Sequence, residues 1–308
     1  MTTDTCAIGV DIGGTKIAAA LVTADGAAKS IQKQPTPSSS PPDIIETVAA
    51  MCRDLMLSTD APISGIGIGA TGQVDVERGM ITYGGDAVRA WAGVRLADEV
   101  AQRTGMRVIV DNDVNAMALG EAQFGAGRGI NSGLYVMVGT GIGGALVING
   151  ELWRGARWSA GEIGHTLVDW RGERRCPCGQ MGHLEGYAAG PAMARHYCAL
   201  TGQPPHGDLR RVAECARDGD TAARDVIVEG ARILGLALGG LVSAFDPDVL
   251  VISGGVPQLG DLWWQPFEAA LRESPVPAAQ GVDLRRAALG TGAVLIGAAW
   301  LAMARGAA

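Results

Sequence analysis

The 308-residue sequence has little of what marks several classes of protein. It contains six cysteines, which are too few for a disulfide scaffold in a chain of this length. Its formal net charge is −7 and it lacks clusters of Lys and Arg, which argues against a nucleic-acid partner. No basic segment followed by an apolar stretch opens the chain, so we expect no secretory signal. These absences predict a cytoplasmic protein.

Long apolar runs are also scarce. The most apolar helical candidate, residues 233–245, is about half as long as a bilayer span and has Arg232 at its edge. We therefore expect a core helix there and no membrane partner. With 47% hydrophobic residues the chain can bury two ordinary cores, and its length favours two domains.

Glycine, in contrast, is abundant and gathers in two turns that each join two apolar, strand-like runs. The first turn lies in Asp11–Lys16, with sequence DIGGTK, and the second in Gly139–Gly144, with sequence GTGIGG. Because glycine has no Cβ and reaches positive φ at little steric cost, backbone N–H groups in such turns can approach an anion. The repeat predicts a duplicated phosphate clamp, for which ATP is the natural ligand, on two related halves.

The second turn also satisfies the G-x-G-x-x-G pattern of dinucleotide-binding folds, in which the third glycine opens a helix. Here the apolar run 145–148 follows and ends at Asn149-Gly150, which is a strong signal for a β-hairpin. A strand–turn–strand unit is therefore favoured, and a dinucleotide-dependent oxidoreductase is the disfavoured alternative. Neither turn has the glycine spacing of a P-loop.

Hydrophobic periodicity and turn residues predict the other main elements. We expect strands at 6–10, 16–22, 63–69, 107–110 and 249–252, and helices at 43–57, 96–104, 114–124, 221–245 and 291–304. A third glycine pair, Gly254-Gly255, follows the last of these strands. Bare backbone there suits a nucleoside, although the pair could equally be a turn that only leads into the next helix.

These motifs, in this order, resemble the ROK family of sugar kinases. The resemblance covers nearly the whole chain and depends on the segments Asp11–Lys16, Val110–Asp113, Gly139–Gly144, Gly161–His165 and Cys176–Glu185. It implies an actin/hexokinase-like α/β fold of two ribonuclease H-like halves with a cleft between the domains. We expect an N-terminal domain of residues 1–112, onto which a helix at 293–308 packs back, and a larger domain of residues 113–292.

The resemblance implies that ATP phosphorylates the 6-hydroxyl of a hexose or aminohexose and that Asp113 accepts the hydroxyl proton. From the residues alone, Asp113 is more simply a helix cap. Asp11, a carboxylate inside a phosphate turn, makes most sense beside Mg²⁺. Lys16 adds charge near the phosphates or faces solvent.

The residues implied in nucleotide binding are Asp11, Gly13, Gly14, Thr15, Lys16, Gly139, Thr140, Gly141, Gly143, Gly254 and Gly255. Those implied in sugar binding are Gly72, Asn112, Asp113, Glu162, His165 and Glu185. For Glu162 and Glu185 the simpler interpretation is a surface glutamate.

A short segment contains Cys176, Cys178 and His183, with His165 a little upstream. Two thiolates and two imidazoles suit tetrahedral Zn²⁺. The family usually has cysteine where His183 stands, and histidine keeps a competent ligand there. Four protein ligands leave no position for water, so we expect a structural zinc that holds the loop before Glu185.

The segment Gly161–Leu167 is most similar to that of N-acetylmannosamine kinases, and glucokinases and N-acetylglucosamine kinases share most of it. A 3-amino sugar as substrate, and polyphosphate as donor, stay open. ROK repressors carry an N-terminal helix-turn-helix, and only a few residues precede the first strand here, so we expect no DNA-binding form. A sugar-sensing protein without catalysis is the alternative, which the retained Asp113 disfavours. The resemblance also implies a homodimer.

Overall fold

The computed structural model describes residues 5–38, 40–84, 88–204 and 207–304. The chain divides into two compact units. The first comprises Met1–Asn131, Ala145–Ala160 and Ala287–Ala308, and the second comprises Ser132–Gly144 and Gly161–Arg286. Two five-stranded sheets and a short two-stranded ribbon organise the described residues.

The first sheet has the strand order β3-β2-β1-β4-β7. Its strands are β1 (Cys6–Ile12), β2 (Lys16–Thr23), β3 (Ala28–Pro35), β4 (Ile63–Ala70) and β7 (Val108–Asn112). The first three strands are antiparallel, whereas β4 and β7 run parallel to β1. Almost every residue of β1 is buried, as expected for a central strand that is covered on both faces.

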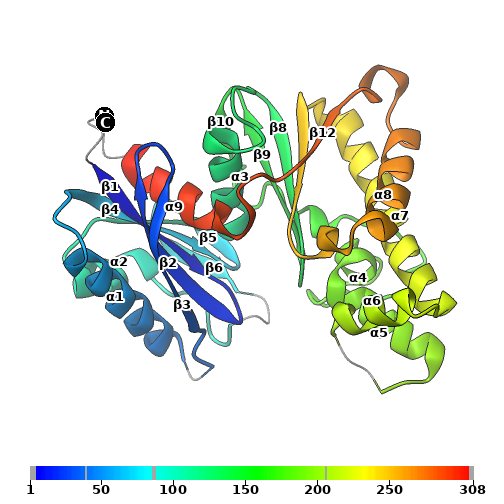
Figure 1. The fold of residues 1–308 in the computed structure, drawn as a ribbon, viewed down its shortest axis with the longest axis horizontal. Helices are drawn as coiled ribbons and strands as arrows, with labels where there is room; N and C mark the ends of the chain where they lie inside the picture. The colour runs from blue at the N-terminus through cyan, green and yellow to red at the C-terminus, as the bar shows by residue number, and fades with distance from the viewer. Residues whose placement is uncertain (1–4, 39, 85–87, 205–206, 305–308) are drawn as a thin grey trace. The chain divides into compact units, whose positions relative to one another are not determined.

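Helices cover both faces of this sheet (Figure 1). They are α1 (Pro41–Leu57) and α2 (Leu96–Thr104) on one face, and α3 (Asp113–Phe124) and α9 (Ala293–Ala304) on the other. Side chains alternate along β1, so Ile8 and Val10 join the core under α1, while Ala7 joins the core under α9. The α9 face is lined by small residues, which bring this helix close to the sheet.

Glycines make that close approach possible. A Cβ on Gly67 would lie 1.7 Å from the carbonyl oxygen of Ala298, and one on Gly297 would lie 1.7 Å from that of Ala116. The backbone of α9 therefore rests on β4 on one side and on α3 on another.

The second sheet has the strand order β10-β9-β8-β11-β12. Its strands are β8 (Gly133–Val138), β9 (Ile142–Ile148), β10 (Glu151–Trp153), β11 (Val249–Ser253) and β12 (Asp283–Arg286). Numbered within each sheet, both orders read 3-2-1-4-5, and in both a glycine turn joins strands 1 and 2. The duplication predicted from the two glycine turns is thus confirmed.

The Asn149-Gly150 turn joins β9 to β10, and both residues have positive φ, at 55° and 77°. The predicted hairpin is confirmed, and a helix-opening dinucleotide turn is excluded at this position. The two-stranded ribbon consists of β5 (Gln73–Asp75) and β6 (Met80–Tyr83).

Helices make up most of the rest of the second unit. They are α4 (Glu185–Ala188), α5 (Gly190–Thr201), α6 (Leu209–Arg217), α7 (Thr221–Phe245) and α8 (Asp261–Glu273), and short 3₁₀ turns include η1 (Ile163–His165) and η2 (Val256–Leu259). Among the described residues, α7 alone is long and apolar enough to cross a bilayer. It packs against α4, α5, α6 and α8, and its Glu229 forms an ion pair with Arg174. This helix is therefore part of the core, as the sequence predicted.

The two units do not divide at residue 112, where we expected a domain boundary. Helix α3 packs against α9 and belongs to the first unit. Residues 145–160 also belong to the first unit. Helix α9 packs on β1 and β4 in the same unit. Residues 305–308, the end of the expected terminal helix, lie outside the described residues.

We predict that Gly67→Ala lowers the free energy of unfolding by about 3 kcal/mol or more, because the new methyl group collides with the backbone of α9. Gly240→Ala is the matched control. Gly240 is exposed in α7 with open space around its Cβ position, so alanine should raise stability by about 0.5–1 kcal/mol. Thermal unfolding of both variants checks this, and equal melting temperatures would contradict it.

Candidate functional site

Hydrogen bonds at its base close the first glycine turn and leave the backbone at its tip exposed. Gly13 N–H donates to the Lys16 carbonyl at 3.0 Å, and the Thr36 hydroxyl donates to the Gly13 carbonyl at 2.6 Å. Gly14 and Thr15 are exposed at its tip. Such a turn can present backbone N–H groups to an anion.

Asp11 lies at the end of β1, directly before this turn. Burial raises the pKa of its carboxyl group to about 6, and the positive charge of Lys16 opposes the rise only in part. A carboxylate that pays this desolvation cost would be stabilised by a cation.

The junction of β7 and α3 brings together three residues that were predicted to bind sugar. Asn112 Oδ1 accepts the N–H groups of Val114 and Asn115 at 2.9 and 3.2 Å, so Asn112 is the N-cap of α3. Asn112 Nδ2 donates to the Gly72 carbonyl at 2.9 Å. Asp113 occupies the first helical position. Its Oδ1 also accepts the Val114 N–H, at 2.9 Å, so Asp113 and Asn112 share the capping of α3.

The Gly72 turn is itself fixed. Gly72 has a φ of 97°, and a Cβ on it would lie 2.4 Å from the Tyr83 carbonyl oxygen. The buried Trp91 ring donates its N–H to the Thr71 carbonyl at 3.0 Å. Only glycine fits this position, because any other residue would collide with the ribbon of β5 and β6.

A buried ion pair that the sequence reasoning missed lies beside this junction. Asp111 Oδ2 accepts hydrogen bonds from Arg154 Nε at 2.8 Å, and Arg154 Nη2 is 2.7 Å from the same oxygen. The two residues are 43 positions apart in the chain, and no local pattern marks their pairing. The signal available was an acidic residue at the end of a buried strand.

In the second unit, Glu185 holds the second glycine turn. Its Oε2 accepts the Ile142 N–H at 2.8 Å, and a Cβ on Gly141 would lie 2.6 Å from that oxygen. The Gly139 carbonyl accepts the Gly190 N–H at 2.9 Å. Glu185 was predicted to bind sugar, and one of its oxygens is bound to this backbone. Thr140 is exposed, and Gly143 is half-buried.

The third glycine turn lies beside the second. Gly254 has a φ of 106°, and a Cβ on it would lie 2.2 Å from the Val138 carbonyl oxygen at the end of β8. Gly255 has open space at its Cβ position. Tertiary structure therefore places both glycine turns of this unit at the ends of the adjacent strands β8 and β11.

Glu162 and His165 lie at the two ends of the 3₁₀ turn η1. Glu162 Oε2 is 3.7 Å from His165 Nε2. Surrounding protein displaces water from Glu162 and raises the pKa of its carboxyl group; His165 opposes this rise, and the negative Glu185 adds to it. Glu185 thus lies close enough to Glu162 for its negative charge to act on that carboxyl group.

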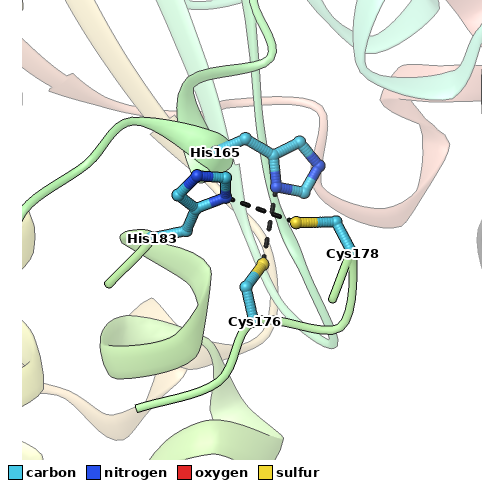
Figure 2. A group of neighbouring side chains, drawn as sticks. All are labelled: His165, Cys176, Cys178 and His183. Atoms are coloured by element: carbon cyan, nitrogen blue, oxygen red, sulfur yellow. Dashed lines mark hydrogen bonds between the residues drawn. The ribbon is translucent and has the colours of Figure 1, made fainter. Parts of the chain in front are cut away.

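The four predicted metal ligands meet at one point (Figure 2). Their ligand atoms all lie within 4.8 Å of one another. Cys176 Sγ is 3.5 Å from His165 Nδ1, and Cys178 Sγ is 3.3 Å from His183 Nδ1. Tetrahedral zinc with bonds of about 2.0–2.3 Å has ligand–ligand edges of about 3.3–3.8 Å. The two sulfur–nitrogen distances and the types of ligand thus fit Zn²⁺.

A second network that the sequence did not reveal anchors the loop that carries these ligands. Arg174 Nη2 lies 2.8–2.9 Å from both oxygens of Glu229 and 2.8 Å from His196 Nε2. The Arg174 guanidinium also stacks over the Tyr187 ring, at 4.7 Å, and the Tyr187 hydroxyl donates to Asp169. The loop is thereby attached to α5 and α7.

Comparisons with known proteins identify relatives that match nearly the whole chain. The model of the ROK family matches residues 7–305. A glucokinase of Halalkalibacterium halodurans is 34% identical over 96% of this chain and 94% of its own, and an N-acetylmannosamine kinase of Escherichia fergusonii is 32% identical over 96% and 97%. The crystal structure of a ROK family glucokinase from Streptomyces griseus with glucose and AMPPNP superposes with a TM-score of 0.84, at 34% identity over 97% of this chain and 99% of that one.

The family match spans nearly the whole chain, and the relatives exceed 30% identity over almost their full lengths. The predicted actin-like fold is confirmed by the structural match and by the repeated strand order. The chain therefore belongs to the ROK family.

Proposed function

We propose that this protein transfers the γ-phosphoryl group of ATP to the 6-hydroxyl of a hexose or aminohexose, with Asp113 as general base. The relatives named glucokinase and N-acetylmannosamine kinase indicate a sugar kinase. The observation that carries the assignment of the base is the β7–α3 junction, where Asn112 supplies the helix cap and Asp113 opens the helix.

Phosphoryl transfer requires alignment of donor and acceptor, neutralisation of phosphate charge and an acceptor for the hydroxyl proton. The positive end of the α3 dipole favours a negative charge at Asp113, and a carboxylate can take that proton. The bare backbone of the turns at 13–15 and 139–141 suits the phosphates, and Lys16 adds positive charge. Gly254 and Gly255 offer a surface for the nucleoside.

Mg²⁺ fits the carboxylate chemistry of Asp11, whose buried charge lacks full compensation by Lys16. When bound with the nucleotide, the ion would neutralise phosphate charge. Asp11 would hold the ion on the nucleotide side, while Asp113 handles the proton. The two carboxylates thus have separate tasks.

Sugar hydroxyls would be held by directional polar groups. Asn112 Nδ2 has a second hydrogen beyond the one donated to Gly72, and Glu185 has an oxygen beyond the one that holds Ile142. His165 faces the metal ligands with Nδ1 and Glu162 with Nε2, so it connects the metal loop to a sugar-binding carboxylate. Such outer contacts orient ligands.

The substrate class that we propose spans glucose, N-acetylmannosamine and N-acetylglucosamine. The structures and names of the relatives support both the plain and the N-acetylated hexoses. We further propose that the protein acts as a cytoplasmic homodimer, as the family resemblance implies.

An ADP-release assay across glucose, mannose, N-acetylglucosamine, N-acetylmannosamine and 3-aminoglucose tests this function. We expect sugar-dependent turnover with at least one of them, and Asp113→Asn should reduce kcat by about 10²–10⁴ because the proton acceptor is lost. Asp98→Asn, an exposed carboxylate on α2, is the matched control and should not change kcat. A folded Asp113→Asn variant with normal turnover would disprove the assignment, and a wild type inactive on every sugar would favour a sensor without catalysis.

Asp11 predicts opposite effects on activity and stability. Because burial raises its pKa to about 6 from 3.8, the folded protein binds more protons than the unfolded chain between these pH values. The contribution of Asp11 to stability therefore falls as pH rises through this window. In the magnesium-free protein at pH 7.5, Asp11→Asn should raise the free energy of unfolding by about 1–3 kcal/mol. This gain should shrink toward pH 4.

The same variant should lose most of its activity, and in the wild type kcat/KM for Mg·ATP should decline below pH 6 as Asp11 is protonated. Thermal unfolding across pH and steady-state kinetics measure the two effects. A variant that is less stable than the wild type at pH 7.5 would contradict the cost that we assign to the buried charge.

The metal ligands predict about one zinc per chain in freshly purified protein. Cys178→Ser should lower the zinc content and raise KM for the sugar about tenfold or more, because the loop that orients His165 and Glu162 loses its anchor. Cys215→Ser, on α6 outside the cluster, should change neither quantity. Elemental analysis and kinetics check this, and active protein without zinc would refute it.

A further inference from the structure

Arg154 and Asp111 form a buried ion pair next to the proposed base. We propose that Arg154 is a positioning residue for phosphoryl transfer: through Asp111 it fixes the backbone turn that presents Asn112 and Asp113 to the sugar. This inference rests on the proposed function. None of the sequence motifs that carry the family resemblance includes Arg154.

The Asp111 carboxylate is fully engaged. Its Oδ1 accepts the Asn112 N–H and the Asn115 side-chain N–H, both at 2.8 Å. Its Oδ2 is held by Arg154 Nε at 2.8 Å and Nη2 at 2.7 Å. The side chain of Asp111 is 2% exposed and that of Arg154 is 17% exposed. Each oxygen of Asp111 thus has two donors and almost no access to water.

The two oxygens have different tasks. Oδ1 orients the backbone of Asn112 and, one helical turn later, the side chain of Asn115. Oδ2 carries the charge that Arg154 compensates. Without the guanidinium, this buried oxygen would be an uncompensated charge unless the carboxylate rotated toward another donor, and that rotation would disturb the bonds of Oδ1.

A disturbance at Oδ1 reaches the reacting groups directly. Asn112 is adjacent to Asp113, caps the same helix and holds the Gly72 carbonyl. In an enzyme active site, a misplacement of about 1 Å can cost about 10²-fold in rate. Arg154 is the cation that pairs with Asp111 among the residues that the structure describes, so its loss would move the junction.

A hydrogen bond to its backbone carbonyl fixes Arg154 within its loop. Its carbonyl accepts the Ala160 N–H at 3.1 Å, which closes the loop between them. The Arg157 carbonyl in that loop accepts the Gln73 side-chain N–H at 3.1 Å, and Trp158 packs against the core of the first unit. Two residues after Ala160 the chain reaches Glu162. The ion pair therefore attaches the base turn to the segment that leads to a proposed sugar ligand.

A purely structural ion pair would have a different signature. Its loss would lower the melting temperature and the folded fraction but leave kcat per folded molecule unchanged. A positioning role lowers kcat in the folded enzyme and leaves KM for ATP unchanged, because the side-chain bonds of Arg154 and Asp111 in the described structure do not reach the phosphate turns at 13–15 and 139–141.

The test compares Arg154→Met, Arg154→Lys, Asp111→Asn and the double variant of Arg154→Met with Asp111→Asn, below their melting temperatures. We expect kcat to fall at least tenfold in Arg154→Met and in Asp111→Asn, with KM for ATP within twofold of the wild type. Arg154→Lys, which keeps the charge, should recover part of kcat. The double variant should lose no more than the worse single variant, because the pair acts as a unit.

Arg157→Met is the matched control, since it removes the same charge from the same loop at an exposed side chain, and kcat should stay within twofold. If Arg154→Met does not fold, Arg154→Lys and Asp111→Asn carry the test. A folded Arg154→Met or Asp111→Asn variant with kcat within twofold of the wild type overturns the inference, as do additive losses in the double variant. A wild type without sugar phosphorylation in the same assay contradicts the proposed function instead.

Discussion

The hydrogen bonds at the junction of β7 and α3 are the constraint on which the first half of the site depends. A helix that starts directly at the end of a buried strand leaves its first N–H groups without intrahelical partners, and Asn112 satisfies two of them. The next residue, Asp113, occupies the first helical position and also accepts the Val114 N–H with its Oδ1, at 2.9 Å. Asp111, the residue before Asn112, orients it by accepting its backbone N–H. Three consecutive polar residues thus have three separate tasks: support, cap and proposed base.

The second unit solves a similar problem with different groups. Its glycine turn at 139–141 is held by one oxygen of Glu185. The metal-ligand cluster includes His183, two residues before Glu185 in the chain. His165 belongs to the cluster with one nitrogen and contacts Glu162 with the other. Binding of a metal would therefore order the Glu162 carboxylate through His165, without any direct contact between the metal and the substrate. Arg174 attaches the loop to α5 and α7 and completes this support.

Much of the fold could be predicted because its central elements are apolar and periodic. Strands β1, β4 and β11 and helices α1, α2, α3 and α7 lie within about two residues of their predicted bounds. Strand β3 was missed because it is a polar edge strand that is exposed over most of its length, and β12 because it is short and charged. Helices α5, α6 and α8 were not predicted; they are amphipathic segments that contain none of the motif residues.

The sequence by itself determined the local chemistry of this protein: which turns are bare backbone, which strand ends carry carboxylates, and which four side chains can bind zinc, since each follows from residue type and short spacing. Only the tertiary structure decided the partners across long separations, such as Arg154 with Asp111 and Arg174 with Glu229, and the division at which α3 joins the first unit. The reason is physical. Pairing over 43 or 55 residues depends on how sheets and helices pack, and packing is set by the whole core rather than by any local pattern.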